Sequence, residues 1–173
     1  MGVSKTFTIS DNFKKRADSA AFFEAWAATK LTRLGLFVNM GPFTIWKPGE
    51  DIEPYLKAVD LVVWTTDSSH GTPVEVKSQN LSFSNVSDYP MERPLVCSQA
   101  SWVRKTVPPS SVTVTDQLYV SRVTGEALWL PSGSPVELGV RVFDKDRNES
   151  YLAVSTWKRH MRPLTDFASS VKR

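Results

Sequence analysis

Two strand-like stretches joined by a short polar turn constrain the fold of this chain more than any other feature. Residues 72–80, with the sequence TPVEVKSQN, alternate apolar and polar side chains, as a strand with one buried face does. Residues 55–64 contain a valine-rich run that also favours a strand. Because the link of residues 65–71 is so short, the two strands are predicted to pair as an antiparallel hairpin.

The register of this hairpin predicts a pair of carboxylates. In regular pairing the numbers of opposed residues add up to a constant, and a constant of 135 places Asp60 opposite Glu75. Lys77 then lies two residues further along on the same face. Opposed Cβ atoms are roughly 5 Å apart, so two carboxylates there repel each other unless a proton or a cation lies between them. A bulge would shift this register. A metal ion between them explains Asp60 at the start of a valine-rich strand better than a random surface charge does.

The residues before the hairpin predict one long helix. It begins at residue 10 or 11, with residue 19 as an alternative start, and ends at residue 34 before Gly35. Its apolar stripe consists of Phe23, Ala27, Leu31 and Leu34. Beside this stripe runs a row of small residues, Ala17, Ala21 and Ala28. Glu24 lies within that row, where it is either directed inward or partly exposed to solvent.

The composition limits the chemistry that is available to the chain. A single cysteine, Cys97, excludes an intrachain disulfide framework and any multi-thiolate zinc site. His70 and His160 are far apart, so a histidine-rich metal site or a serine triad is poorly supplied. The formal net charge of +3 permits a polyanionic partner without requiring one. No apolar run has the length of a membrane span and the N-terminus lacks a signal-peptide core, which favours a reduced, cytoplasmic protein.

The rest of the chain predicts a β-rich C-terminal part within one domain, residues 1–173. Further strands are predicted at residues 36–40, continuing to 43–46, and at 112–114, 117–123, 127–130, 136–143 and 151–157. Residues 5–9 form a short strand or an ordered arm, and residues 47–54 and 81–90 are loops. A short helix is predicted after Pro94, and the tail after Pro163 is a short helix or frayed.

These elements, taken in order, resemble the PD-(D/E)XK nuclease superfamily, which includes restriction endonucleases, Holliday junction resolvases and many phage and repair nucleases. The resemblance covers roughly residues 22–80: a helix with Glu24, a strand that opens with Asp60, a turn, and Glu75-Val76-Lys77. Val59 stands where the proline of the motif's name would be. The resemblance implies an α/β fold with a central mixed β-sheet flanked by helices, a restriction-endonuclease-like core with a β-rich C-terminal part.

The resemblance also implies roles for individual residues. Asp60 and Glu75 would coordinate Mg²⁺, or Mn²⁺, together with the backbone carbonyl of Val76. Lys77 would orient or activate the attacking water. Glu24 would assist metal binding, directly or through water. The implied reaction is the hydrolysis of phosphodiester bonds in DNA.

Contacts with DNA are less sharply indicated by the sequence. Gln79 is a possible further site residue because it lies on the same strand face as Lys77. The basic clusters that could contact phosphates are Lys14, Lys15 and Arg16, then Arg104 and Lys105, and Lys158 and Arg159. The alternative interpretation is that each cluster is a solvated helix end or strand edge that does not bind phosphate. Trp102, Trp129 and Trp157 are better explained as core or dimer contacts than as base-stacking platforms.

Three functions are compatible with these observations. The first is a metal-dependent DNA endonuclease, and the small size suits a Holliday junction resolvase. The second is a catalytically silent nuclease-fold protein that binds nucleic acid or a protein partner. The third is an unrelated α/β protein in which Glu75 and Lys77 are a surface feature. The presence of Asp60, Glu75 and Lys77 together favours the first. By analogy a homodimer is expected, because two sites are the simplest way to cut both strands.

Overall fold

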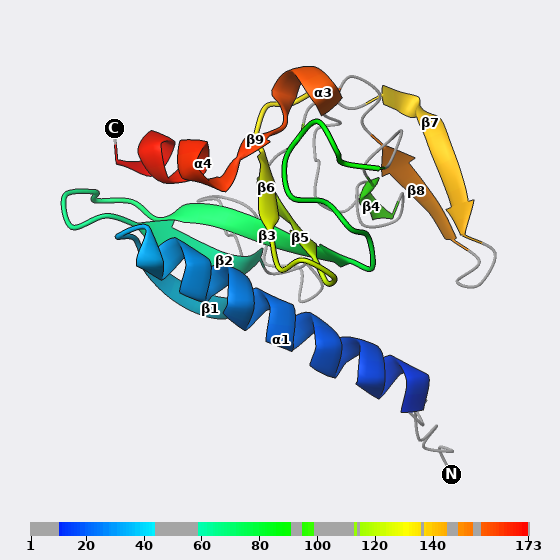
Figure 1. The fold of residues 1–173 in the computed structure, drawn as a ribbon, viewed down its shortest axis with the longest axis horizontal. Helices are drawn as coiled ribbons and strands as arrows, with labels where there is room; N and C mark the ends of the chain where they lie inside the picture. The colour runs from blue at the N-terminus through cyan, green and yellow to red at the C-terminus, as the bar shows by residue number, and fades with distance from the viewer. Residues whose placement is uncertain are drawn as a thin grey trace, which may run out of the picture.

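The computed structural model describes residues 11–43, 59–90, 95–98, 113, 115–135, 137–144, 149–153 and 157–172. Its helices and strands, in chain order, are α1 (Asp11–Arg33), β1 (Phe37–Phe43), β2 (Val59–Trp64), β3 (Thr72–Gln79), β4 (Leu95–Ser98), β5 (Asp116–Ser121), β6 (Ala127–Leu130), β7 (Glu137–Asp144), β8 (Glu149–Ala153), α3 (Trp157–His160), β9 (Arg162–Pro163) and α4 (Leu164–Val171) (Figure 1). Within the described ranges, no helix is both long and apolar enough to cross a membrane.

A six-stranded mixed sheet forms the centre of the fold. Its strand order is β1-β2-β3-β5-β6-β9, with β3 and β5 parallel and the other neighbours antiparallel. A second sheet of order β4-β8-β7 is built from later segments of the chain. The predicted fold class, α/β with a central mixed sheet and a β-rich C-terminal part, is therefore confirmed.

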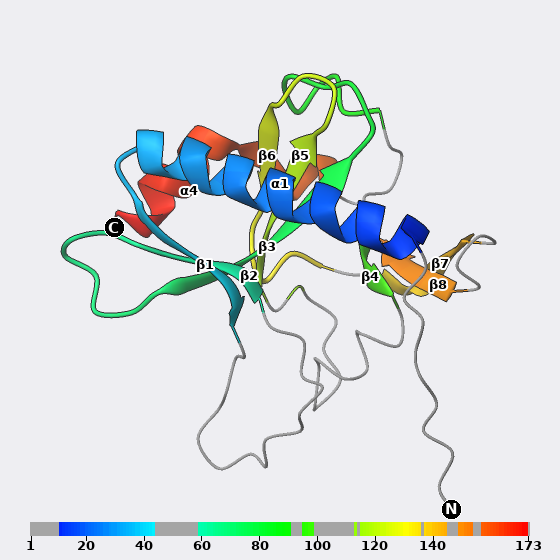
Figure 2. The same cartoon turned by 90° about the horizontal axis from the view of Figure 1, so that it is seen from below.

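Helices α1 and α4 cover the same face of the six-stranded sheet, which we call the helix face. Ala27, Ala28 and Leu31 of α1 share one buried cluster with Leu164, Phe167 and Ala168 of α4 and with Leu61, Val74 and Leu118 of the strands. Figure 2 shows α1 running across the strands. Trp129 belongs to this core, as predicted, because its ring packs on Phe167 with 5.5 Å between centroids.

The long helix has the bounds that its sequence pattern predicts. α1 begins at Asp11 and ends at Arg33, one residue before the predicted end, and Gly35 follows with a φ of 81°, in the left-handed region that glycine adopts without strain. The apolar stripe is also confirmed, since Ala27 and Leu31 are buried. The row of small residues is only partly confirmed: Ala28 is buried, but Ala21 is exposed. The side chain of Ala17 lies outside the described part.

The hairpin has the predicted register. Leu61 pairs with Val74, Val62 with Pro73 and Val63 with Thr72. The residue numbers of each pair add up to 135, the constant from which the sequence predicted Asp60 opposite Glu75. The turn is short enough that a shifted register would place the valines of both strands on the wrong face. The sequence therefore predicted the register of the hairpin correctly.

Three local predictions are wrong. The segment after Pro94 is the strand β4, because Leu-Val-Cys is β-prone and β8 supplies a partner. The strand predicted at 117–123 ends at Ser121, whose hydroxyl accepts the backbone N–H groups of residues 123 and 124 and so turns the chain. The strand predicted at 151–157 ends at Ala153, and Trp157 begins α3. Residues 5–9, 44–58 and 99–112 lie outside the described residues, whereas the predicted helix after Pro163 is confirmed as α4.

Candidate active site

Asp60, Glu75 and Lys77 lie on the face of the sheet opposite to the helices. Leu61 and Val74 are fully buried against α1, and side chains alternate along a strand. The residues beside them, Asp60 and Glu75, therefore project to the other side. We call this the site face, and define it by Asp60, Glu75, Lys77 and Gln79 together with their partners on β5.

Glu75 and Lys77 form a buried ion pair. Lys77 Nζ lies 2.9 Å from Glu75 Oε2, and the side chain of Glu75 is 1% exposed whereas that of Lys77 is 21% exposed. Taking a carboxylate out of water is costly unless a cation and hydrogen bonds compensate it. The lysine supplies that positive charge and also reaches the surface. The pair therefore has one end in the core and one end accessible from outside.

Asp60 lies just beyond the last described backbone pair between β2 and β3, and its side chain contacts β3 instead. The described pairs of this ladder end at Leu61–Val74, one residue before Asp60 would pair with Glu75. Asp60 Oδ2 accepts a hydrogen bond of 2.7 Å from the backbone N–H of Val76. A short polar side chain thus satisfies the backbone of β3 at this point. The contact fixes one Asp60 oxygen next to the Glu75-Val76-Lys77 segment.

Strand β5 extends the site face beside β3, which the sequence did not predict. Its parallel ladder with β3 pairs Glu75 with Gln117 and Lys77 with Tyr119. Gln117 is 3% exposed and Tyr119 is fully buried, and the Tyr119 hydroxyl donates to Gln117 Oε1 at 2.9 Å. The alternation of polar and apolar residues in β5 was a signal in the sequence that one face of this strand carries polar side chains. Its pairing with β3 could not be predicted. Parallel strands are joined by a long crossover, and no turn between them marks the two strands as partners.

The loop of residues 81–90 covers the end of the site face at Gln79. The Tyr89 hydroxyl donates to Gln79 Oε1 at 2.7 Å, and the Tyr89 ring packs on Phe83 and Tyr119. Burial raises the pKa of Tyr89 and the bond to Gln79 partly counteracts it, so this hydroxyl stays protonated and remains a donor. The loop is held by Ser121, whose hydroxyl donates to the Leu81 carbonyl at 2.6 Å. Gln79 is therefore a fixed, partly buried group.

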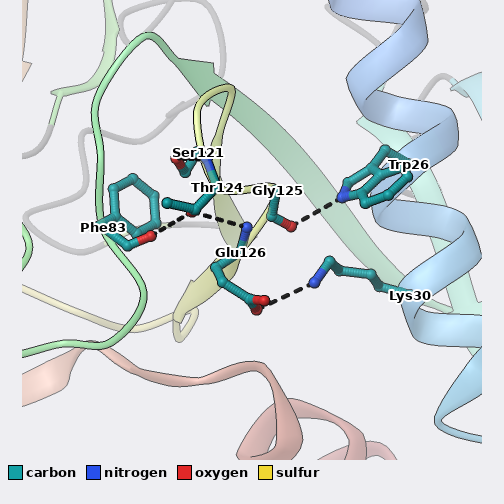
Figure 3. A network of polar contacts seen from close by, with 7 residues as sticks. All are labelled: Trp26, Lys30, Phe83, Ser121, Thr124, Gly125 and Glu126. Atoms are coloured by element: carbon teal, nitrogen blue, oxygen red, sulfur yellow. Dashed lines mark hydrogen bonds and ion pairs between the residues drawn. The ribbon is translucent and has the colours of Figure 1, made fainter.

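The turn between β5 and β6 joins this loop to α1. Thr124 donates through its hydroxyl to the carbonyl of Phe83, and Trp26 Nε1 donates to the carbonyl of Gly125 at 2.9 Å (Figure 3). Lys30 forms an exposed ion pair of 3.1 Å with Glu126. Helix, turn and loop are thus connected by polar contacts around one end of β5.

Glu24 is the predicted site residue that α1 contributes. It is one helical turn before Ala27 and Ala28, on the stripe of α1 that packs on the helix face, and it is partly buried. The structure brings together Asp60, Glu75 and Lys77 through the Glu75–Lys77 ion pair and the hydrogen bond from the Val76 N–H to Asp60, with Gln79 further along β3. The role of Glu24 in the site stays a prediction.

The predicted DNA contacts can be placed only in part. Lys14, Lys15 and Arg16 lie in the first turns of α1, and Lys158 lies in α3, but their side chains are outside the described part. Arg159 of α3 is exposed. Arg104 and Lys105 lie outside the described residues altogether.

The donor atoms on the site face suit a hard divalent cation. Among the described residues, no group of three or more histidine, cysteine, aspartate or glutamate side chains is arranged to hold a metal. Asp60 and Glu75 nevertheless offer two carboxylates on one face. Mg²⁺ is commonly bound through one or two carboxylates, with water and substrate phosphate completing the shell. The residues present therefore fit Mg²⁺ or Mn²⁺ better than zinc.

Comparisons with known proteins give one structural likeness. No protein-family model matches the sequence, and no curated protein matches it. The solved structure of Hjc, a Holliday junction resolvase from Archaeoglobus fulgidus, aligns with a TM-score of 0.46 and 10% sequence identity, covering 87% of this chain and 98% of that chain. The function is therefore best sought in the residues of the site face.

Proposed function

We propose that this protein is a divalent-metal-dependent nuclease that hydrolyses phosphodiester bonds in DNA. The observation that supports the proposal most directly is the buried Glu75, paired with Lys77 at 2.9 Å and next in sequence to Val76, whose backbone N–H donates to Asp60. A carboxylate that served only as surface charge would not need to be 1% exposed. Two carboxylates and an ammonium on one strand face are the groups that metal-assisted hydrolysis requires.

In this proposal Asp60, Glu75 and the Val76 carbonyl hold Mg²⁺ or Mn²⁺. When bound, such a cation stabilises the negative charge that develops on the phosphate and lowers the pKa of a bound water. Lys77 is the group that orients the attacking water, because its ammonium lies beside the Glu75 carboxylate and its side chain is partly exposed. A role for Glu24 remains a prediction of the family resemblance. Cleavage of both strands by a homodimer likewise remains a prediction.

The reaction can be tested with supercoiled, linear and four-way-junction DNA in Mg²⁺, in Mn²⁺ and in EDTA. We expect the parent to cut at least one substrate in the presence of metal and none in EDTA. Glu75→Gln, Asp60→Asn and Lys77→Met should each lose at least about 100-fold in cleavage rate, as expected when a charge-stabilising group is removed. Glu24→Gln is tested separately, because the role of Glu24 is implied by the family resemblance alone.

Another ion pair among the described residues, Lys30–Glu126, supplies the matched control. Glu126→Gln and Lys30→Met remove a carboxylate and an ammonium from an exposed pair of similar length, 3.1 Å, away from the site face. These variants should cut DNA like the parent. If no metal supports cleavage by the parent, or if the site variants cut as well as the control variants, the proposal is wrong. Binding of DNA without cleavage would instead identify a catalytically silent protein.

A further inference from the structure

Arg122 follows the last residue of β5 and is held against the end of β3. Its backbone N–H donates to the Gln79 carbonyl at 2.8 Å, which extends the contact between the two parallel strands by one residue. Its guanidinium donates to the Ser78 hydroxyl from Nη2 at 2.8 Å and from Nε at 3.2 Å. Both acceptors directly follow Lys77 in the chain, so Arg122 is fixed next to the segment that carries the proposed site.

The side chain of Arg122 is exposed, yet its position is defined by its neighbours. The ring of Phe23 in α1 lies against the guanidinium, with 5.4 Å between Cζ and the ring centroid. Contacts with β3 and α1 together restrict the side chain, so a ligand that binds it loses little further entropy. In the part of the chain that the structure describes, no carboxylate forms an ion pair with Arg122, whereas Lys30 and Lys77 each pair with a glutamate. The positive charge of Arg122 is thus held at the surface without an acidic partner among those residues.

The two bonds to Ser78 use only one edge of the guanidinium. Arginine has five N–H donors in a fixed plane, one on Nε and two on each Nη. Ser78 takes the edge formed by Nε and Nη2. The edge formed by Nη1 and Nη2 presents two parallel donors, the arrangement that binds two oxygens of one phosphate. The geometry of Arg122 therefore suits a phosphate group at this second edge.

We propose that Arg122 binds a backbone phosphate of DNA and that Ser78 is a positioning residue, which orients the Arg122 guanidinium. The inference rests on the proposed function for the identity of the ligand, because the phosphate belongs to the DNA that would be cut. It adds a contact from the end of β5 that none of the predicted basic clusters includes. Binding can be measured in EDTA, without metal and without cleavage.

Titrations of fluorescent linear and four-way-junction DNA in EDTA, at several salt concentrations, test this contact. Arg122→Gln should lower the affinity about 10-fold, and the slope of log affinity against log salt should fall by about one. Arg122→Lys keeps the charge but not the two parallel donors, so it should retain the slope and lose part of the affinity. Ser78→Ala should also retain the slope and lose affinity, because the charge remains while its orientation is lost. Parent-like affinity in Ser78→Ala would refute the positioning role.

Arg162 supplies the matched control for Arg122. It is also exposed, and its Nη1 donates to the Met161 carbonyl at 3.0 Å, but it lies in the edge strand β9. Arg162→Gln should bind DNA like the parent. If Arg122→Gln binds as this control does, or if the parent binds no DNA, the inference is overturned whatever the cleavage assay shows. If binding depends on Arg122 but the parent cuts no DNA with either metal, the proposed function fails and the phosphate contact is upheld.

Discussion

At the scale of single residues, two lysine–glutamate pairs of similar length differ in how far they are buried. The side chains of Lys30 and Glu126 are 22% and 48% exposed, whereas Glu75 in the other pair is 1% exposed. An exposed pair contributes about 0–1 kcal/mol to folding, because water already solvates both charges. Removing one partner of a buried pair costs more, because it leaves a charge without compensation. Burial, rather than distance, makes the Glu75–Lys77 pair a candidate for function.

Lys77→Met should therefore destabilise the protein far more than Lys30→Met. We expect a loss of about 2–4 kcal/mol in the free energy of unfolding for Lys77→Met without metal, less than for a fully buried pair because Lys77 reaches the surface. Lys30→Met should lose less than about 1 kcal/mol. Mg²⁺ should restore part of the loss in Lys77→Met, since a bound cation compensates Glu75. Urea unfolding with and without Mg²⁺ measures this, and equal losses in the two variants would contradict it.

Asp116 makes the stability depend on pH. Its Oδ1 accepts hydrogen bonds from Trp129 Nε1 at 2.7 Å and from the backbone N–H of Ser132 at 3.1 Å. Burial raises the pKa of Asp116 above its ordinary value of 3.8, and these two bonds counteract it in part. Because the folded-state pKa is the higher one, this contribution to stability is complete below the unfolded pKa and is lost as the pH rises through the folded pKa.

Asp116→Asn keeps an oxygen for Trp129 but does not titrate. As the pH rises from below 3.8 to neutrality, the free energy of unfolding of the variant should therefore increase relative to that of the parent. Urea unfolding at a series of pH values measures the difference. A difference that stays constant over this range would show that Asp116 does not titrate with a raised pKa.

At the scale of elements, α1 is attached to the β5–β6 turn through Trp26. Gly125 has a φ of 72°, and a Cβ there would lie 3.2 Å from the Trp26 ring. Gly133 also has a positive φ, 80°, but a Cβ there would have nothing within 4 Å. The two glycines thus share the backbone requirement and differ in packing. Comparing an alanine at each position therefore separates the free-energy cost of the left-handed conformation from the cost of moving Trp26.

Gly125→Ala should cost more stability than Gly133→Ala. Both variants place a Cβ in the left-handed region, at a cost of about 1 kcal/mol. Gly125→Ala should lose about 1 kcal/mol more, because the Trp26 ring must move and its bond to the Gly125 carbonyl weakens. Thermal unfolding followed by tryptophan fluorescence measures both. Equal losses would mean that the contact between helix and turn contributes little.

At the scale of the whole molecule, a net charge of +3 is too small to identify a binding surface, so a surface for the proposed DNA substrate is sought in the arrangement of the basic residues. Lys14, Lys15 and Arg16 lie in the first turns of α1, which runs across the six-stranded sheet (Figures 1 and 2). Three consecutive cations on a helix start offer several phosphate contacts. On the site face, the positive charge of Lys77 is accompanied by two carboxylates, Asp60 and Glu75. In the proposed function, affinity for DNA is therefore expected to come from residues outside Asp60, Glu75 and Lys77.

Replacing Lys14, Lys15 and Arg16 together by alanine should weaken DNA binding and its dependence on salt. The slope of log affinity against log salt should fall by up to about 3, roughly one per lost phosphate contact. Arg33→Ala, which removes an exposed arginine from the other end of the same helix, is the control and should leave the slope unchanged. Titrations of fluorescent DNA at several salt concentrations measure the slopes. The same slope in both variants would place DNA elsewhere on the protein.

The sequence alone predicted the features that depend on neighbouring residues: α1 with Gly35 at its end, and the β2–β3 register that opposes Asp60 and Glu75. Periodicity and a short turn are local properties, so these elements could be read without a fold. Only the tertiary structure decided which face of the sheet α1 covers. It also decided that β5 pairs with β3 in parallel, which brings Gln117 and Tyr119 beside the ion pair. That pairing joins segments separated by a long crossover, and nothing in the residues of either strand specifies its partner.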